Sequence, residues 1–299
     1  MTRIPVILDT DIGGDIDDTW ALAMLLKSPE LDPQLVVSDT GDTTYRAKII
    51  AKMLQVAERT DVPVGVGTPT DGHRTCNQGQ WVEGYELADY PGTVHDDGVG
   101  AIIETILGSP EPVALICIGP VPNIAEALAR EPRIADNARF VGMHGSLRKS
   151  HRPDGKVIPE CNVVNGVAAC RSAFTAPWDV TVTPLDTCGF VTLTGEKYQA
   201  VRHCEDPVIQ ALMENYRVWL ENRDRAAVID VRSSTLFDTV AVYLAFAEDL
   251  FVMEELGIAV TDDGYTVLDE NARPIRVAAE WRDLDAFEDL LVARLTGGS

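Results

Sequence analysis

The feature that most constrains the fold is an alternation of short apolar runs with longer stretches of helical period. The runs are rich in β-branched residues, and the stretches between them repeat apolar side chains at spacings of three and four. This order is typical of parallel strands joined by helices, so we expect an α/β fold with an open, mostly parallel sheet flanked by helices. Strands are predicted at 5–8, 35–38, 62–66, 113–118, 138–143 and 180–184.

Helices are predicted at 18–27, 45–58, 98–107, 123–131, 165–173, 207–222 and 234–247. The C-terminal end differs, because apolar runs at 264–268 and 275–279 enclose a polar turn at 269–273. This pattern predicts a hairpin that leads into a final helix. No repeat, low-complexity tract or flexible linker interrupts the 299 residues, so we expect a single domain over 1–299.

The chain is strongly acidic, with 47 Asp and Glu against 25 Lys and Arg and a formal net charge of −22. Such a surface repels phosphate backbones and anionic lipid, so neither nucleic acid nor a membrane is an expected partner. No apolar run approaches the roughly 20 residues of a spanning helix, and the N-terminus does not resemble a signal peptide. We therefore expect a cytoplasmic protein whose six cysteines are mostly buried thiols.

The most informative segment follows the first predicted strand. Asp9, Asp11, Asp15, Asp17 and Asp18 place five carboxylates in ten residues around a pair of glycines. One of the last two is expected to cap the following helix. The others would repel one another unless a cation neutralises them, and oxygen ligands without Cys or His favour Ca²⁺ or Mg²⁺ over zinc.

Five motifs in order resemble the inosine-uridine nucleoside hydrolases, a family of calcium-dependent N-ribosyl hydrolases. The aspartate run is similar to the family's first motif, and GPVPN at 119–123 is similar to its G-P-L-T-N. MHG at 143–145 and ECN at 160–162 are similar to M-G-G and E-F-N, and Phe237-Asp238 to H-D. The resemblance extends from residue 4 to about residue 295. It implies a nucleoside hydrolase-like fold, and by analogy a homodimer or homotetramer.

The resemblance also implies roles for individual residues. Asp11, Asp18, Asp238 and the main-chain carbonyl of Pro122 would bind Ca²⁺. Asp17, Asn162 and Glu160 would bind the sugar, with Glu160 near its 5′ end, and Asp9 would support the loop. The implied reaction is hydrolysis of the N-glycosidic bond of a ribonucleoside or related ribosyl compound to ribose and free base. A Ca²⁺-bound water, activated by Asp11, would attack the sugar.

The sequence departs from the family pattern on the side of the base. The first motif is two residues longer than the commonest form, and Asp42 stands where the family often has a sugar-binding asparagine. His95 lies in a segment that only approximates the family's histidine motif near the base. Phe237 replaces the histidine that protonates the leaving base in one branch, and Phe237 cannot supply a proton. Trp81, in the long loop 68–97, is a candidate for stacking on the base.

Other candidates remain open at this point. His144 and His151 are possible proton donors, though His95 is nearer to the expected position. Tyr216 and Trp219 are three residues apart on a predicted helix, so they belong either to the core or to the base site.

Two other functions compete with hydrolysis of a ribosyl bond. A relative that binds calcium and sugar with little or no hydrolase activity is compatible with Phe237. A haloacid-dehalogenase-like phosphatase would explain Asp9 and Asp11 after a strand, but it needs a lysine and a second acidic pair after later strands. Here the second pair, Asp17 and Asp18, lies in the same loop, and the site is acidic where a phosphate needs cations.

Overall fold

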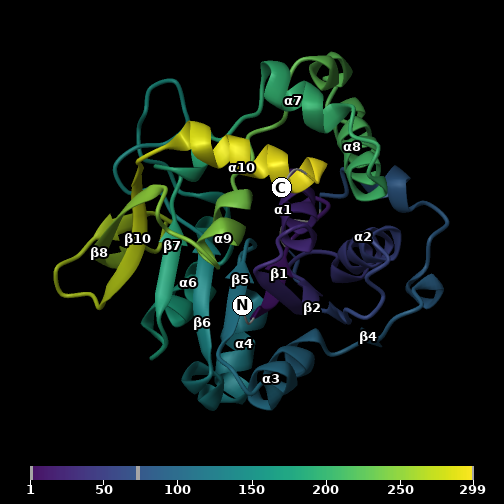
Figure 1. Ribbon diagram of the computed structural model, residues 1–299. Coiled ribbons are helices and arrows are strands. Elements are labelled where there is room, and N and C mark those ends of the chain that lie inside the picture. Colours follow the sequence, from purple (N-terminus) through teal and green to yellow (C-terminus); the bar gives the residue numbers. More distant parts are fainter. Residues whose placement is uncertain (1–2, 72–74, 298–299) are drawn as a thin grey trace.

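A ten-stranded sheet with helices on both faces organises the part of the chain that the computed structural model describes, residues 3–71 and 75–297 (Figure 1). The strand order is β4-β3-β2-β1-β5-β6-β7-β10-β8-β9. All pairs from β4 to β10 are parallel, and only β10 with β8 and β8 with β9 are antiparallel. The predicted open, mostly parallel sheet is confirmed.

The strands are β1 (Ile4–Thr10), β2 (Leu31–Ser38), β3 (Val64–Val66), β4 (Val94–His95), β5 (Val113–Cys117), β6 (Ala138–Met143), β7 (Val180–Thr183), β8 (Phe251–Val260), β9 (Thr266–Leu268) and β10 (Pro274–Trp281). The helices are α1 (Asp17–Leu26), α2 (Thr43–Val56), α3 (Gly98–Gly108), α4 (Pro122–Arg130), α5 (Cys161–Asn165), α6 (Val167–Thr175), α7 (Gly195–Arg202), α8 (Pro207–Glu221), α9 (Thr239–Leu244) and α10 (Leu284–Thr296).

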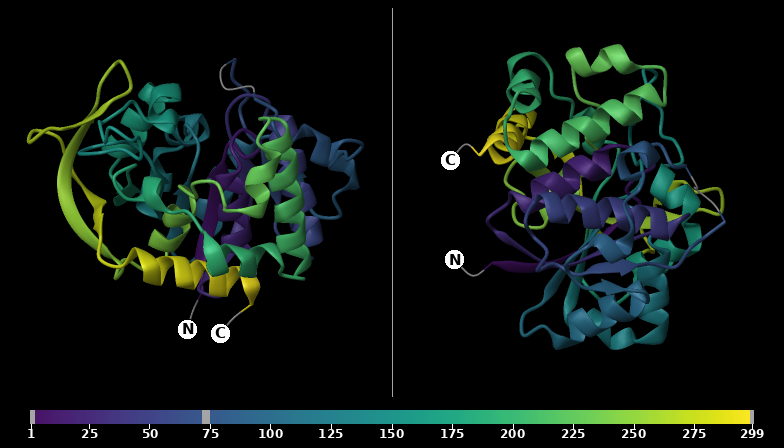
Figure 2. Two further views of the ribbon diagram at one scale, coloured as in Figure 1. Left: turned by 90° about the horizontal axis from the view of Figure 1, so that it is seen from above. Right: turned by 90° about the vertical axis from the view of Figure 1, so that its right-hand side faces the viewer.

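Two hydrophobic clusters, one on each face of the sheet, form the core. Helices α1, α2 and α7 to α10 belong to one cluster, whereas α3, α4 and α6 belong to the other (Figures 1 and 2). The central strand β1 contributes to both, with Val6 and Leu8 in the first cluster and Ile7 in the second. Burial on both faces explains why the parallel strands are continuous apolar runs.

The predicted C-terminal hairpin is wrong in its pairing. The segments 264–268 and 275–279 do not pair with each other, because β9 and β10 both pair with β8. The sequence analysis missed β8, whose burial is mostly partial and whose middle carries Glu254 and Glu255. The final helix is confirmed as α10.

Two predicted helices are shorter or divided. The helix predicted at 165–173 is interrupted at Gly166, where a Cβ atom would lie 2.0 Å from the carbonyl oxygen of Pro120. The helix predicted at 234–247 is shorter in the structure, where it is α9, and Asp238 is the residue directly before it. Helix α7 and the two-residue strand β4 were not predicted. Within the described ranges, no helix has the length and apolar character needed to span a membrane.

The sheet brings the ends of its central strands together. Strand β1 lies between β2 and β5, and Asp9 near its end is in register with Val37 and Cys117. Ligands of open α/β sheets bind outside the carboxyl ends of such strands. The acidic loop that follows β1 is therefore at the expected place for a site.

Candidate active site

The loop between β1 and α1 holds its carboxylates in fixed positions. Its turn depends on Gly13, whose φ of +104° is unfavourable for residues with a side chain. The N-cap of α1 is Ile16, which has no side-chain cap, so neither Asp17 nor Asp18 caps the helix as predicted. Both lie in its first turn, where the helix dipole favours anions, and the hydroxyl of Thr10 donates to Asp18 Oδ1 at 2.5 Å.

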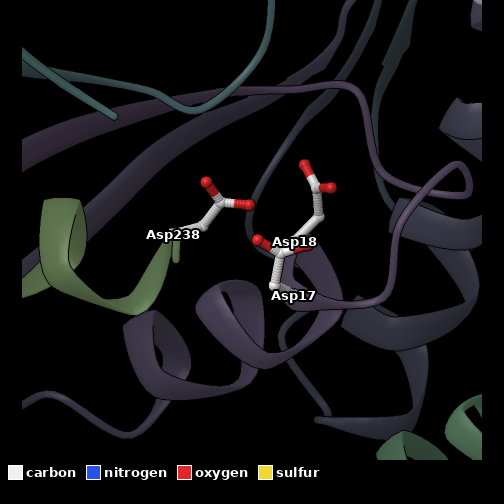
Figure 3. A group of neighbouring side chains, drawn as sticks. All are labelled: Asp17, Asp18 and Asp238. Atoms are coloured by element: carbon white, nitrogen blue, oxygen red, sulfur yellow. The ribbon is translucent and has the colours of Figure 1, made fainter. Parts of the chain in front are cut away.

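Three buried carboxylates meet at this loop. Oxygen atoms of Asp17, Asp18 and Asp238 lie within 4.8 Å of one another. Figure 3 shows that the first two come from the start of α1 and the third from the residue before α9. Burial raises the pKa of each well above its usual value, and repulsion from neighbouring carboxylates raises it further. Burial and mutual repulsion therefore disfavour the charged form of these groups, and Asp17 shares a hydrogen bond with Asp238.

Asp11 lies beside this group, although it is not one of the three. Its side chain lines the cavity, and its Oδ2 is 3.8 Å from Nη2 of the buried Arg46. Asp9 lies behind it, where its Oδ1 accepts a hydrogen bond from Nδ2 of Asn123 at 2.8 Å. Burial raises the pKa of Asp9 to about 7. Pro122 is the first residue of α4 and is not among the residues that line the cavity.

Glu160 and Asn162 form a second wall of the cavity. Glu160 caps α5 by accepting hydrogen bonds from the amides of Asn162 and Val163, and it also accepts one from Gly145. Burial raises its pKa to about 7. The side-chain amide of Asn162 donates hydrogen bonds to the main-chain carbonyls of Ile118 and Met143. These two bonds fix the orientation of the side chain at the ends of two strands.

The cavity has a volume of about 590 Å³ and is open to solvent, and Phe237 is among the residues that line it. The ring of His151 lies against Phe237, with centroids 5.1 Å apart and planes at 71°. His95 is not near the cavity, because it pairs with Gly65 in β4 at the edge of the sheet. The structure thus brings His151 to the place where the sequence analysis preferred His95.

Two other predicted substrate contacts also lie elsewhere. The Trp81 side chain is buried beneath Lys52, and its Nε1 donates to Glu214. Asp42 is exposed and caps α2 by accepting a hydrogen bond from the amide of Tyr45. Neither residue lines the cavity. The geometry of the cavity therefore gives no support to a substrate contact by Trp81 or Asp42.

His144 is also excluded from the cavity. Its side chain is 1% exposed, and its Nε2 donates to the carbonyl of Gly119 at 3.1 Å. Tyr216 and Trp219 both belong to the buried core, and both also line a smaller hollow that shares lining residues with the cavity. Arg152 and Arg223 line the cavity and were missed, because only the packing of the long loops and of α8 brings them there.

The comparisons with known proteins agree with this geometry. Residues 6–289 match the family described as inosine-uridine preferring nucleoside hydrolase. Probable uridine nucleosidase 2 of Arabidopsis thaliana is 26% identical over 94% of this chain and 90% of that protein. The non-specific ribonucleoside hydrolase RihC of Salmonella agona is 28% identical over 87% of this chain and 84% of its own length.

Solved structures share the fold. A plant nucleoside hydrolase, PpNRh1, superimposes with a TM-score of 0.83 at 21% identity, and the match covers 99% of both chains. The inosine-uridine preferring nucleoside hydrolase of Bacillus anthracis has a TM-score of 0.74 at 20% identity, covering 99% of this chain. The phosphatase interpretation has no support from these matches. The chain belongs to the inosine-uridine preferring nucleoside hydrolase family, whose members are N-glycosidases.

Proposed function

We propose that the protein hydrolyses the N-glycosidic bond of a ribonucleoside or related ribosyl compound, with Ca²⁺ as its cofactor, to give ribose and a free base. The observation that carries this proposal is the buried group of Asp17, Asp18 and Asp238 at a cavity that also exposes Asp11. The cavity volume of about 590 Å³ is in the range of small-molecule sites.

The carboxylates fit a hard divalent cation. All three are buried, they offer only oxygen, and their mutual repulsion would be relieved by positive charge. We propose Asp11, Asp18, Asp238 and the carbonyl of Pro122 as ligands, and the proximity of Asp17 makes it a further one. A bound Ca²⁺ would orient the ribose hydroxyls and make a water molecule more acidic.

The protein groups would then act on a held sugar. Asp11 accepts the proton of the attacking water, while Asp17 and Asn162 hydrogen-bond the ribose hydroxyls. Glu160 lies near the 5′ end of the sugar, and Asp9 supports the loop from behind. The surrounding anionic carboxylates favour the positive charge that develops on the ribose as the bond to the base lengthens.

On the leaving-group side, Phe237 offers a flat apolar contact. His151 replaces His95 as the proposed proton donor, because its ring lies in the cavity against Phe237. The proposal includes no substrate contact from His95, Trp81 or Asp42.

The test is a panel of ribonucleosides and their 2′-deoxy analogues, assayed for free sugar with and without Ca²⁺. We expect cleavage that depends on Ca²⁺ and a rate several powers of ten lower for the deoxy analogues, because a buried polar site rejects a substrate that lacks a hydroxyl. Equal rates on both sugars would show that the sugar site is misassigned. Binding of Ca²⁺ and ribosides without release of sugar would favour the alternative of a non-hydrolytic relative.

We also propose that the protein forms a homodimer or homotetramer, by analogy with its family. Light scattering that gives a mass near 32.5 kDa would contradict this. The cytoplasmic location stays a prediction from sequence.

A further inference from the structure

The outer part of the active-site cavity is basic, although its floor and the whole protein are acidic. A second hollow of about 190 Å³ is continuous with the cavity, since both are lined by Asp15, His151, Arg223 and Phe237. Beyond these shared residues, the hollow is lined by Trp219 and by further cationic and polar side chains: Arg225, Arg232, Ser233, Ser234 and Thr235. Among its lining residues, Asp15 is the one carboxylate. The acidic floor therefore gives way to arginines on the side of Phe237.

These arginines are not neutralised within the protein. In the described part of the chain, Arg152, Arg223, Arg225 and Arg232 form no ion pair, although acidic residues greatly outnumber basic ones. Arg217 on α8 lies outside the hollow and differs from these arginines, because it forms an ion pair with Glu221.

Arg223 is oriented by an aromatic ring, and the guanidinium of Arg232 is held through Nη1, which donates to the carbonyl of Ser233 at 3.1 Å. The guanidinium of Arg223 lies over the indole of Trp219 at 4.2 Å, and Trp219 Nε1 donates to the carbonyl of Gly14 in the acidic loop at 3.2 Å. The hydroxyl of the buried Tyr216 donates to the carbonyl of Arg232 at 3.1 Å. A guanidinium stacked on a ring keeps its N–H edge available for a bidentate contact with a carboxylate.

We infer that the leaving group of the substrate is a flat ring with an anionic substituent, bound by Arg223 and Arg232 beside Phe237. This inference rests on the proposed function, which places the sugar on the acidic floor and the leaving group at Phe237. A ring whose nitrogen is already cationic leaves without protonation, so its departure does not depend on a proton from His151. When a pyridinium riboside is hydrolysed, a C1′–O bond forms to water and the C1′–N bond breaks. Its electron pair neutralises the ring nitrogen, and the water proton passes to Asp11.

The test compares nicotinate riboside with nicotinamide riboside, which differ only in carboxylate against carboxamide. With Ca²⁺ present, we expect a kcat/KM about tenfold higher for the carboxylate, since one charge-assisted hydrogen-bonded contact contributes about that factor. The preference should decrease at high salt, because Arg223 is exposed and Arg232 is partly exposed to solvent. Arg223→Gln and Arg232→Gln, singly and combined, should bring the ratio towards one.

The matched control is Arg217→Gln, which removes an arginine of α8 that does not line the hollow. This variant should retain the full preference. A third substrate, nicotinamide riboside 5′-phosphate, places the anion on the sugar instead of the ring. If the arginines favoured the phosphate and ignored the carboxylate, the assignment to the leaving group would be wrong.

Direct binding separates this inference from the proposed function. If the ribosides are not cleaved, calorimetry of the Ca²⁺-loaded protein measures the dissociation constants of nicotinate riboside and nicotinamide riboside. Tighter binding of the carboxylate without turnover would support the inference and count against the proposed hydrolysis. Cleavage of neutral ribosides without any preference for the carboxylate would support the hydrolysis and overturn the inference.

Discussion

At the scale of single residues, His151 and His144 differ in their access to the cavity. His151 is exposed in the cavity, where burial of part of its ring and the charge of Arg152 lower its pKa. His144 is enclosed between Phe140 and Phe174 and faces the carbonyl of Gly119. His151 is therefore accessible to a molecule in the cavity, whereas His144 is enclosed by the fold.

Replacing His151 by Asn should lower kcat for inosine by about a hundredfold, the usual contribution of a positioned acid. The loss should be smaller for p-nitrophenyl riboside, which leaves without protonation and should already be the better substrate of the unmodified protein. Because the pKa of His151 is lowered, the rate on inosine should rise as the pH decreases below 7. An equal loss on both substrates would assign His151 to binding instead of proton donation.

His144 should make stability depend on pH. Burial lowers its pKa from 6.5 to about 4, so the unfolded chain binds a proton between these values and the folded chain does not. Its contribution is complete above pH 6.5 and is lost as the pH falls through 4, up to about 3 kcal/mol. Urea unfolding of His144→Gln should therefore lose less stability over this interval than the parent protein. The raised pKa of Glu160 acts in the opposite direction in both proteins and cancels in the comparison.

At the scale of elements, the turn between β1 and α1 determines where the carboxylates lie. At Gly13 a Cβ atom would lie 2.7 Å from Cε1 of Tyr45 and 2.8 Å from Cδ1 of Ile49. The hydroxyl of Tyr45 donates to the carbonyl of Gly13, so helix α2 directly supports the turn. The shape of the acidic loop therefore depends on a glycine at position 13, where a side chain would not fit.

Gly13→Ala should lower the free energy of unfolding by about 1 to 3 kcal/mol, because alanine is strained at positive φ and meets the Tyr45 ring. It should also weaken Ca²⁺ binding, since Asp17 and Asp18 follow the turn. Gly108→Ala is the control, since a Cβ there meets nothing within 4 Å. Urea unfolding and calcium titration of both variants measure the two effects, and an unchanged calcium affinity in Gly13→Ala would show that the turn does not position the ligands.

The elements also show what a sequence can predict. The parallel strands β1 to β3 and β5 to β7 were predictable because burial on both faces gives continuous apolar runs, as in Val113–Cys117. Strand β8 was not, because most of its positions are only partly buried and its middle carries Glu254 and Glu255. The acidic loop was visible as a local motif, whereas Asp238 was found only through resemblance. The meeting of His151 with Phe237 and Arg223 has no local signal, since it depends on how a loop and α8 pack over the sheet.

At the scale of the whole molecule, Ca²⁺ should stabilise the fold by joining α1 to α9. At a concentration 100 times its dissociation constant, calcium should add about 2.7 kcal/mol to the free energy of unfolding, and chelation should remove it. Asp238→Asn should abolish the effect, whereas Asp262→Asn, an exposed surface change, should not. Binding displaces protons from carboxylates whose pKa is raised, so the affinity should increase with pH. Thermal unfolding with calcium or with a chelator measures the stabilisation, its loss in Asp238→Asn and its dependence on pH. An unchanged unfolding midpoint would contradict the metal site.

Asp17 and Asp18 are separated from Asp238 by about 220 residues of chain. At 5 to 20 residues per second, a ribosome needs roughly 10 to 45 s to add the third carboxylate after the first two. During that time the nascent chain presents two acidic groups without the partner that completes the site. A cation that needs all three carboxylates would therefore be bound only late in synthesis, and a chain truncated before α9 would carry the aspartate motif without its third carboxylate.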